Sequence, residues 1–178
     1  MNINGWMLPP EALSYIVENL PSGSRILEFG SGNGSITLSE SYHVTSIEHD
    51  QLWLNVAPVK YIHAPIVDNE VSAQCGESGW YDIDVIRRHS PFDVDFVIID
   101  GPPGDIGRRG LLAHLDILPP DVDLMVDDVD REDERALMEG LVEKLGLAPK
   151  IFESGLTRGD GTPRAFAILS KTTSEGNR

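Results

Sequence analysis

Two acidic residues bracket a glycine-rich turn in the segment ILEFGSGNGSIT, residues 26–37. Glu28 lies inside the apolar run, and Glu48 follows it by twenty residues in the sequence SIEHD. The turn between them contains Gly30, Gly32 and Gly34. Glycines that join a strand to a helix let the backbone approach a ligand closely, and an acid at this separation can accept both hydroxyls of a ribose. The spacing G-x-G-x-G differs from the dinucleotide pattern G-x-G-x-x-G, so it favours an adenosine-type ligand without a pyrophosphate.

The alternative for this segment is a purely structural turn. In that interpretation the glycines only connect a strand to a helix, and Glu28 and Glu48 are solvated at strand ends. The charge of the N-terminal part favours the ligand, because the only lysine or arginine between Met1 and Val59 is Arg25. Such an acidic environment suits a small cationic ligand.

Three aspartates form a second group that could do chemistry. Asp100 ends the apolar segment DVDFVIID, and Asp127 and Asp128 end the next one, LMVDD. Because neighbouring parallel strands end at one edge of a sheet, these carboxylates should lie together beside the glycine turn. Carboxylates in one pocket repel each other unless a cation is present, and Mg²⁺ prefers such oxygen ligands. The sequence therefore predicts a magnesium site that would bind an acceptor hydroxyl and lower its pKa. In the alternative, Asp128 and Asp130 cap the next helix and Asp127 is solvated.

These residues need a sheet to position them, and strand and helix patterns alternate along the chain. Apolar runs predict strands over residues 25–30, 43–50, 59–67, 93–104, 122–129, 150–155 and 164–170. Helices are predicted over residues 9–20, 33–42, 51–58, 80–89, 106–118 and 130–146, with a loop over 68–79. Alternation of this kind indicates a parallel sheet with helices on both faces. We expect one domain over residues 1–170, which begins with the helix 9–20, and a disordered tail over 171–178.

The composition limits the partners and the location. The protein has 178 residues, 40% of them hydrophobic, and a formal net charge of −15. So acidic a protein repels the phosphates of nucleic acids and the surfaces of anionic membranes, and neither is an expected partner. The single cysteine, Cys75, excludes an intrachain disulfide, and no apolar segment has transmembrane length. We therefore expect a cytoplasmic protein. Arg108 and Arg109 could bind an anionic substrate group, but we expect them on a solvated face.

The motifs around the glycines resemble those of a known enzyme family. ILEFGSGNGSITL together with SIEHD resembles the first two motifs of class I S-adenosylmethionine-dependent methyltransferases, and DFVIIDGPPG resembles their fourth motif. The resemblance extends over residues 25–170. It implies an α/β fold with a Rossmann-like, doubly wound, mainly parallel sheet of seven strands, of which the last is antiparallel.

The resemblance also implies roles for single residues. The methionine part of S-adenosylmethionine would lie over the turn, with Glu28 near its amino group and Glu48 on the ribose hydroxyls. His49 and Asp100 complete the expected cofactor site around the turn residues Gly30, Ser31, Gly32, Asn33 and Gly34.

The adenine ring has three candidate partners, Trp80, Tyr81 and Asp82. An aromatic side chain could stack on the base, and a carboxylate could accept a hydrogen bond from its amino group. In the alternative, Trp80 packs in the core and Asp82 caps a helix.

The aspartates resemble the ligands of the metal-dependent O-methyltransferases, in which an aspartate after the fourth strand and an Asp-Asn pair after the fifth hold Mg²⁺. Here the pair is Asp127-Asp128, and GPPG rather than a lysine follows Asp100, which is the candidate catalytic residue. The implied reaction is methyl transfer to an oxygen of a small molecule or sugar. Two alternatives are an NAD-dependent oxidoreductase, disfavoured by the glycine spacing and the absence of Tyr-x-x-x-Lys, and a degenerate methyltransferase-like domain that binds without turnover.

Overall fold

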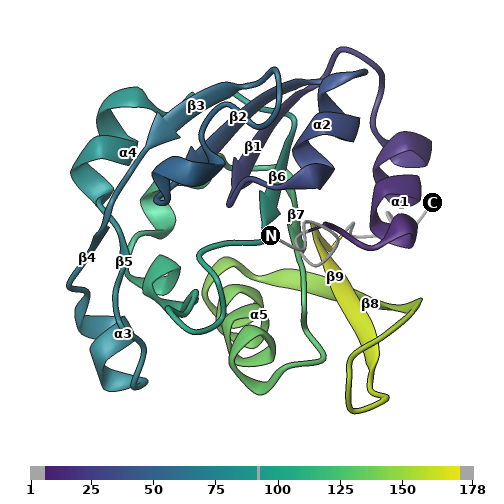
Figure 1. Cartoon of the computed structure of the whole chain (residues 1–178). Coiled ribbons are helices and arrows are strands. Elements are labelled where there is room, and N and C mark those ends of the chain that lie inside the picture. The colour runs from purple at the N-terminus through teal and green to yellow at the C-terminus, as the bar shows by residue number, and fades with distance from the viewer. Residues whose placement is uncertain (1–6, 92, 173–178) are drawn as a thin grey trace, which may run out of the picture.

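The computed structural model describes residues 7–91 and 93–172. It is built on one seven-stranded sheet with the order β3-β2-β1-β6-β7-β9-β8 (Figure 1). The strands are β1 (Arg25–Phe29), β2 (His43–Glu48), β3 (Lys60–His63), β6 (Phe96–Ile99), β7 (Asp123–Val126), β8 (Leu147–Thr157) and β9 (Pro163–Lys171). The pairs from β3 to β7 are parallel, whereas β9 is antiparallel to both β7 and β8. The predicted fold class, including the reversed last strand, is confirmed.

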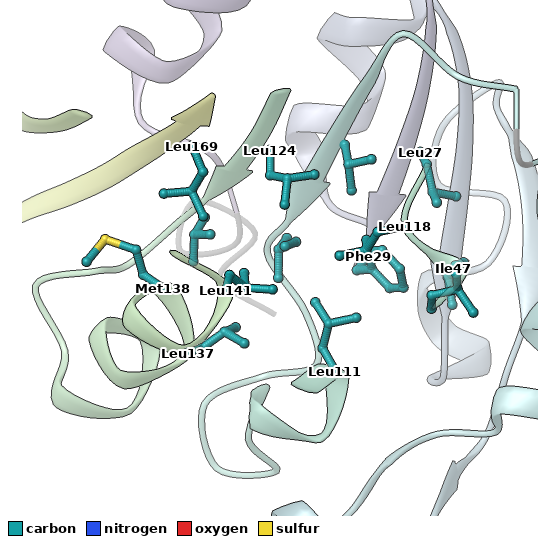
Figure 2. Packing of buried hydrophobic residues seen from close by; sticks show 14 of the residues in the cluster. Leu27, Phe29, Ile47, Leu111, Leu118, Leu124, Leu137, Met138, Leu141 and Leu169 are labelled. Carbon is teal, nitrogen blue, oxygen red and sulfur yellow. The ribbon is translucent and has the colours of Figure 1, made fainter. Parts of the chain in front are cut away.

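Helices cover both faces of this sheet, because side chains along each strand point alternately to opposite sides. The helices are α1 (Pro10–Asn19), α2 (Asn33–Ser39), α3 (Glu70–Gln74), α4 (Ile83–His89) and α5 (Glu132–Leu145). In β1, Ile26 packs in a cluster with residues of α1 and α2, whereas Leu27 packs in a second cluster with residues of α4 and α5. Figure 2 shows the second cluster, in which Leu137 and Leu141 of α5 lie beneath Leu124 and Leu169, and Phe29 lies beside Leu118 and Ile47 farther along the sheet. This layering places the strand ends at one open edge.

Four of the six predicted helices are present as α-helices, and the other two are only short turns. The predicted helix 106–118 consists of two 3-10 turns, η3 (Arg109–Ala113) and η4 (Leu115–Ile117), and the predicted helix 51–58 is only the turn η2 (Gln51–Trp53). The predicted loop 68–79 is wrong, because it contains α3. Asn69 begins that helix by accepting hydrogen bonds from the N–H groups of Val71 and Ser72, a capping signal that does not need apolar periodicity.

The segment after β2 also differs from its prediction. The expected strand 59–67 is divided, since β3 ends at His63 and β4 (Ile66–Val67) pairs instead with β5 (Trp80–Tyr81) in a separate antiparallel ribbon. The expected helix 80–89 therefore begins only at Ile83.

The described chain includes the predicted first helix and the first residue of the predicted tail, Lys171, which is in β9 and not disordered. Helix α1 lies within the predicted range 9–20, and β9 extends to Lys171. Residues 173–178 of the predicted tail are outside the described ranges. Among the helices in residues 7–91 and 93–172, none has the length and apolar character needed to cross a membrane.

Candidate functional site

A cavity of about 620 Å³ lies at the carboxyl ends of the parallel strands. Its wall includes Gly30 and Ser31 after β1, Glu48 and His49 after β2, and Asp100 after β6. Strands β2 and β6 lie on opposite sides of β1, so this is the point at which the strand order reverses. Ligands of open parallel sheets bind at such a point. The structure thus brings these five predicted cofactor residues to one cavity.

The turn after β1 and the loop after β6 approach each other at two glycines. Gly30 has φ +89°, in the left-handed region, and a Cβ atom there would lie 2.9 Å from the Cα atom of Gly101. A Cβ atom on Gly101 would in turn lie 2.6 Å from the hydroxyl oxygen of Tyr81. These positions need glycine because the two backbones are in contact at the cavity wall.

The other predicted turn residues have structural roles. Gly32 precedes α2, and Asn33 is the first residue of that helix. Gly34 packs against Leu8, since a Cβ atom there would lie 3.5 Å from the Leu8 side chain. None of these three residues is on the wall of the cavity in the described part of the chain. Their prediction as cofactor contacts is not supported by their position, and they shape the turn that carries Gly30 and Ser31.

Glu48 is presented to the cavity in a fixed orientation. Its Oε2 accepts a hydrogen bond from the Ser31 N–H at 2.9 Å, and its Oε1 accepts from the N–H groups of His49 (2.6 Å) and Asp50 (2.7 Å). The residue is only 3% exposed, so the alternative of a solvated acid at a strand end is wrong. These backbone donors hold a charged acceptor at the cavity wall, where it can accept further hydrogen bonds.

Glu28 does not reach the cavity, which corrects its predicted contact with a ligand amino group. It is 3% exposed, and Ser46 and Ser35 each donate a hydroxyl hydrogen bond to its carboxylate, the latter at 2.7 Å. The Ser35 oxygen in turn accepts from the Gly32 N–H at 3.1 Å. Through these two serines, Glu28 links β1 to β2 and to the backbone of the glycine-rich turn. Burial raises its pKa to about 7, although the two serine hydroxyls oppose that shift.

The buried Glu28 predicts a pH-dependent stability. A carboxyl group with a raised folded-state pKa stabilises the fold fully below pH 4.5, and this contribution is lost as the pH rises through about 7. Relative to Glu28→Gln, which cannot ionise, the wild-type free energy of unfolding should fall by about 3 kcal/mol across this interval. Urea unfolding at pH 4.5, 6 and 8 measures the difference. A wild-type to variant difference that stays constant with pH would contradict the assignment.

The structure gives Trp80 and Asp82, two of the three adenine candidates, the alternative roles of core packing and helix capping. Trp80 is 1% exposed and packs against Phe29 and His114, with ring centroids 5.8 and 5.6 Å apart. Asp82 caps α4 by accepting from the Asp84 and Val85 N–H groups. In the described part of the chain, neither residue lines the cavity. The Tyr81 ring is buried beneath Gly101, so it is not free to stack on a base in this arrangement.

Asp100, Asp127 and Asp128 meet as predicted. One carboxylate oxygen from each lies within 4.8 Å of the others. Asp100 and Asp128 line the cavity, whereas Asp127 is fully buried behind them. Helix α5 begins after Arg131 without a side-chain cap, so the alternative role of Asp128 as its cap is wrong. Asp130 is no cap either, because it accepts from Arg158 and from the Ala165 N–H on β9.

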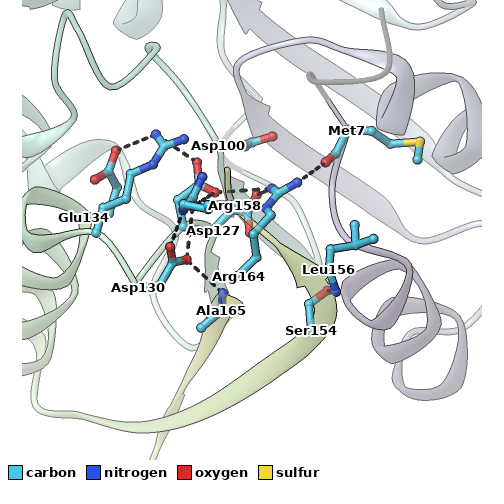
Figure 3. A network of polar contacts seen from close by, with 12 residues as sticks. Met7, Asp100, Asp127, Asp130, Glu134, Ser154, Leu156, Arg158, Arg164 and Ala165 are labelled. Carbon is cyan, nitrogen blue, oxygen red and sulfur yellow. Dashed lines mark hydrogen bonds and ion pairs between the residues drawn. The ribbon is translucent and has the colours of Figure 1, made fainter. Parts of the chain in front are cut away.

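Four arginines surround Asp128, and sequence reasoning did not identify this cluster. Arg158 and Arg164 lie 2.7 and 3.2 Å from its Oδ1, and Arg131 and Arg108 lie 3.2 and 3.4 Å from its Oδ2. Figure 3 shows Arg158 and Arg164 reaching into the aspartate cluster from the β8–β9 hairpin. The expectation for Arg108 is wrong, because this side chain is 4% exposed instead of solvated. No local pattern marks Arg158 or Arg164, which are distant in sequence from Asp128.

Burial and the neighbouring arginines shift the pKa values of the three aspartates in different directions. Although burial opposes it, the four guanidinium groups hold the pKa of Asp128 below its usual value. Burial and the neighbouring Asp100 and Asp128 raise the pKa of Asp127 well above its usual value. Burial also raises the pKa of Asp100 to about 6, because it outweighs the attraction of Arg108. Asp100 is 27% exposed at the cavity and is thus a carboxylate that can exchange a proton with a ligand near neutral pH.

This cluster does not fit a divalent ion, and the residue that prevents the fit is Asp128. The Oδ1 atom of Asp127 has no hydrogen-bond partner among the described residues and is a suitable donor. Both oxygens of Asp128, however, are occupied by guanidinium groups. An ion such as Mg²⁺ requires about six oxygen ligands, and here it would be surrounded by fixed positive charges.

Comparisons with solved structures show similarity in fold at low sequence identity. An O-methyltransferase from Bacillus cereus in complex with SAH matches with a TM-score of 0.63 and 14% identity, over 96% of this chain and 85% of that chain. The O-methyltransferase TomG from Streptomyces achromogenes, involved in tomaymycin synthesis and solved with SAM, gives 0.58 and 17%, over 94% and 83%. The N-methyltransferase NodS from Bradyrhizobium japonicum gives 0.59 and 12%, over 90% and 93%.

No protein-family model matches the sequence, and no curated protein matches it. At these identities the structural similarity shows the fold alone. Two of these enzymes are O-methyltransferases and the third is an N-methyltransferase, so the methylated atom differs among proteins with this fold. The chain has the Rossmann-like fold of these methyltransferases, a seven-stranded sheet with its cavity at the carboxyl ends of the parallel strands.

Proposed function

We propose that this chain is an S-adenosylmethionine-dependent methyltransferase that methylates an oxygen of a small molecule or sugar. The observation that carries the proposal is one cavity bordered by the turn after β1, by Glu48 after β2 and by Asp100 after β6. Its volume of about 620 Å³ is in the range of small-molecule sites. The similar folds that contain SAM or SAH support the choice of cofactor.

The charge of the cavity suits a cationic cofactor. Its wall carries eight acidic side chains against four arginines, Arg108, Arg131, Arg158 and Arg164. Arginines pair with four of the wall acids, which are Asp100, Asp128, Asp133 and Glu134. Among the described residues, no arginine or lysine pairs with the other four, which are Glu48, Asp50, Asp105 and Glu132, so they leave an acidic excess at the wall. Such a field attracts a ligand that carries a sulfonium and an ammonium group.

The proposed mechanism gives each wall residue one task. When bound, S-adenosylmethionine would supply a methyl group on a sulfonium. The acceptor oxygen would form a bond to the methyl carbon as the C–S bond breaks, and the electron pair of that bond would remain on sulfur in S-adenosylhomocysteine. Glu48 would accept hydrogen bonds from the ribose hydroxyls. Asp100 takes the proton of the acceptor hydroxyl on a carboxylate oxygen as the new O–C bond forms. The remaining contribution is orientation of the two reactants.

Cofactor binding is the first test of this proposal. Calorimetry with S-adenosylhomocysteine should show one site per chain, and NAD should show none. In Glu48→Gln, an amide N–H₂ replaces a charged acceptor, so the affinity for S-adenosylhomocysteine should fall by roughly 1–3 kcal/mol, or about 5- to 150-fold.

Asp95→Asn is the matched control for this measurement. Asp95 accepts from the backbone N–H of Arg25 at the amino end of β1, which is the opposite end of that strand from the cavity. Its substitution should leave the affinity unchanged. If Glu48→Gln binds S-adenosylhomocysteine like the wild type, the ribose assignment is wrong; if NAD binds instead, the oxidoreductase alternative replaces the proposal.

A further inference from the structure

Arg108 occupies the centre of the aspartate cluster. Its Nη2 lies 3.2 Å from Asp100 Oδ1 and 3.4 Å from Asp128 Oδ2. Its Nε donates to the carbonyl of Pro102 at 2.9 Å, and its Nη1 donates to the carbonyl of Asp127 at 3.2 Å. The planar guanidinium therefore connects the loop after β6 to the end of β7 through four contacts.

Arg164 makes the corresponding contacts from the other side. Its Nη2 lies 2.8 Å from Asp127 Oδ2 and 3.2 Å from Asp128 Oδ1, and its Nη1 donates to the carbonyl of Met7. The dashed contacts in Figure 3 show Arg164 between Met7 and the aspartates. The two arginines are 4% and 16% exposed, so water screens these charges weakly.

We infer that Arg108 and Arg164 are the cations of this cluster and hold the three aspartates together in place of a divalent metal ion. Close acidic groups need positive charge beside them wherever they are ionised, and the guanidinium groups supply it as part of the chain. A divalent ion at the same carboxylates would have to displace at least one buried arginine from its partners. The contacts alone carry this inference. Its consequence, that methyl transfer proceeds with a metal chelator present, rests on the proposed function.

The test compares metal binding and melting in four proteins: the wild type, Arg108→Ala, Arg108→Lys and the control Arg87→Ala. Arg87 pairs with the exposed Asp116 on the surface and does not line the cavity. Each protein is melted in EDTA and in excess Mg²⁺, and the wild type is titrated with Mg²⁺ and Mn²⁺ by calorimetry. A site filled at 100 times its dissociation constant would raise the melting temperature by roughly 5–10 °C.

We expect no heat of metal binding and no Mg²⁺-dependent shift in the wild type or in Arg87→Ala. Arg108→Ala should melt well below Arg87→Ala in EDTA and recover partly in Mg²⁺, because its free carboxylates then need another cation. Arg108→Lys should melt between the wild type and Arg108→Ala and should not respond to Mg²⁺. This lysine variant keeps the test decisive if the alanine variant does not fold.

Two results would overturn the inference. One is metal binding by the wild type that Asp127→Asn or Asp128→Asn removes. The other is a folded Arg108→Ala protein that melts like Arg87→Ala or does not respond to Mg²⁺. Neither result depends on methyl transfer, so both are distinguishable from failure of the proposed function, which the S-adenosylhomocysteine titration measures.

Discussion

Asp100→Asn should lower the turnover number for methyl transfer by roughly 100- to 10,000-fold, the contribution of a positioned general base. The carboxylate lies on the cavity wall, is held by Arg108 at 3.2 Å, and has a pKa raised to about 6 by burial. The amide that replaces it has nearly the same shape but cannot take a proton at neutral pH. A panel of small hydroxyl compounds, assayed for release of S-adenosylhomocysteine, identifies an acceptor for the measurement.

The pH profile distinguishes a base from a residue that only shapes the cavity. Since Asp100 must be ionised to accept a proton, wild-type kcat/KM should rise with pH through about 6 and then level off. The residual activity of Asp100→Asn should lack this rise. Asp105→Asn is the control, because Asp105 also lines the cavity but is exposed. Equal losses in both variants would indicate a general electrostatic effect and would refute the role of Asp100 as base.

Gly30→Ala should destabilise the fold by about 2–5 kcal/mol and abolish measurable binding of S-adenosylhomocysteine. Two costs add at this position. A side chain at φ +89° costs about 1–2 kcal/mol, and a Cβ atom 2.9 Å from Gly101 Cα forces the two backbones apart at a further cost of about 1–3 kcal/mol. Separation of these loops also moves Ser31 away from Glu48, to which it donates at 2.9 Å.

Two other glycines separate these costs. Gly23 has φ +85°, but a Cβ atom at this position would have no neighbouring atom within 4 Å, so Gly23→Ala should show the conformational cost alone. Gly159 has neither feature, and Gly159→Ala should change the free energy of unfolding by less than about 0.5 kcal/mol. Urea unfolding of the three variants gives the comparison. If Gly30→Ala is no less stable than Gly23→Ala, the close approach of Gly101 does not constrain the site.

The sequence alone indicates which strand ends form the cavity. Apolar runs that end in Glu48, Asp100 or the pair Asp127-Asp128 predict parallel strands, and parallel strands in alternation with helices must end at one edge. The same patterns therefore predict that the three aspartates meet, which the structure confirms within 4.8 Å. These conclusions depend on local periodicity and on one general rule of topology, and both can be read from a single chain.

The partners of those side chains depend on contacts between distant segments. Glu28 is an acidic residue, as expected of a contact to a cationic ligand group. In the fold, however, its carboxylate accepts hydrogen bonds from the hydroxyls of Ser35 and Ser46. The residue types of Trp80 and Asp82 are equally compatible with a cofactor contact and with core packing or helix capping. Only their positions in the fold, on β5 and at the start of α4, decide between these roles.

The sequence by itself determined the α/β alternation, the turn after the first strand and the edge at which the acids gather. Only the tertiary structure decided which positively charged side chains pair with those acids. Arg158 and Arg164 follow Asp128 by 30 and 36 residues, and the antiparallel pairing of β7 with β9 brings them back over the cluster. A count of carboxylates in the sequence therefore predicts a metal ion, whereas the fold supplies guanidinium groups. The physical reason is that charge balance in a buried cluster is a property of all the segments that meet there, and not of the one segment that carries the acids.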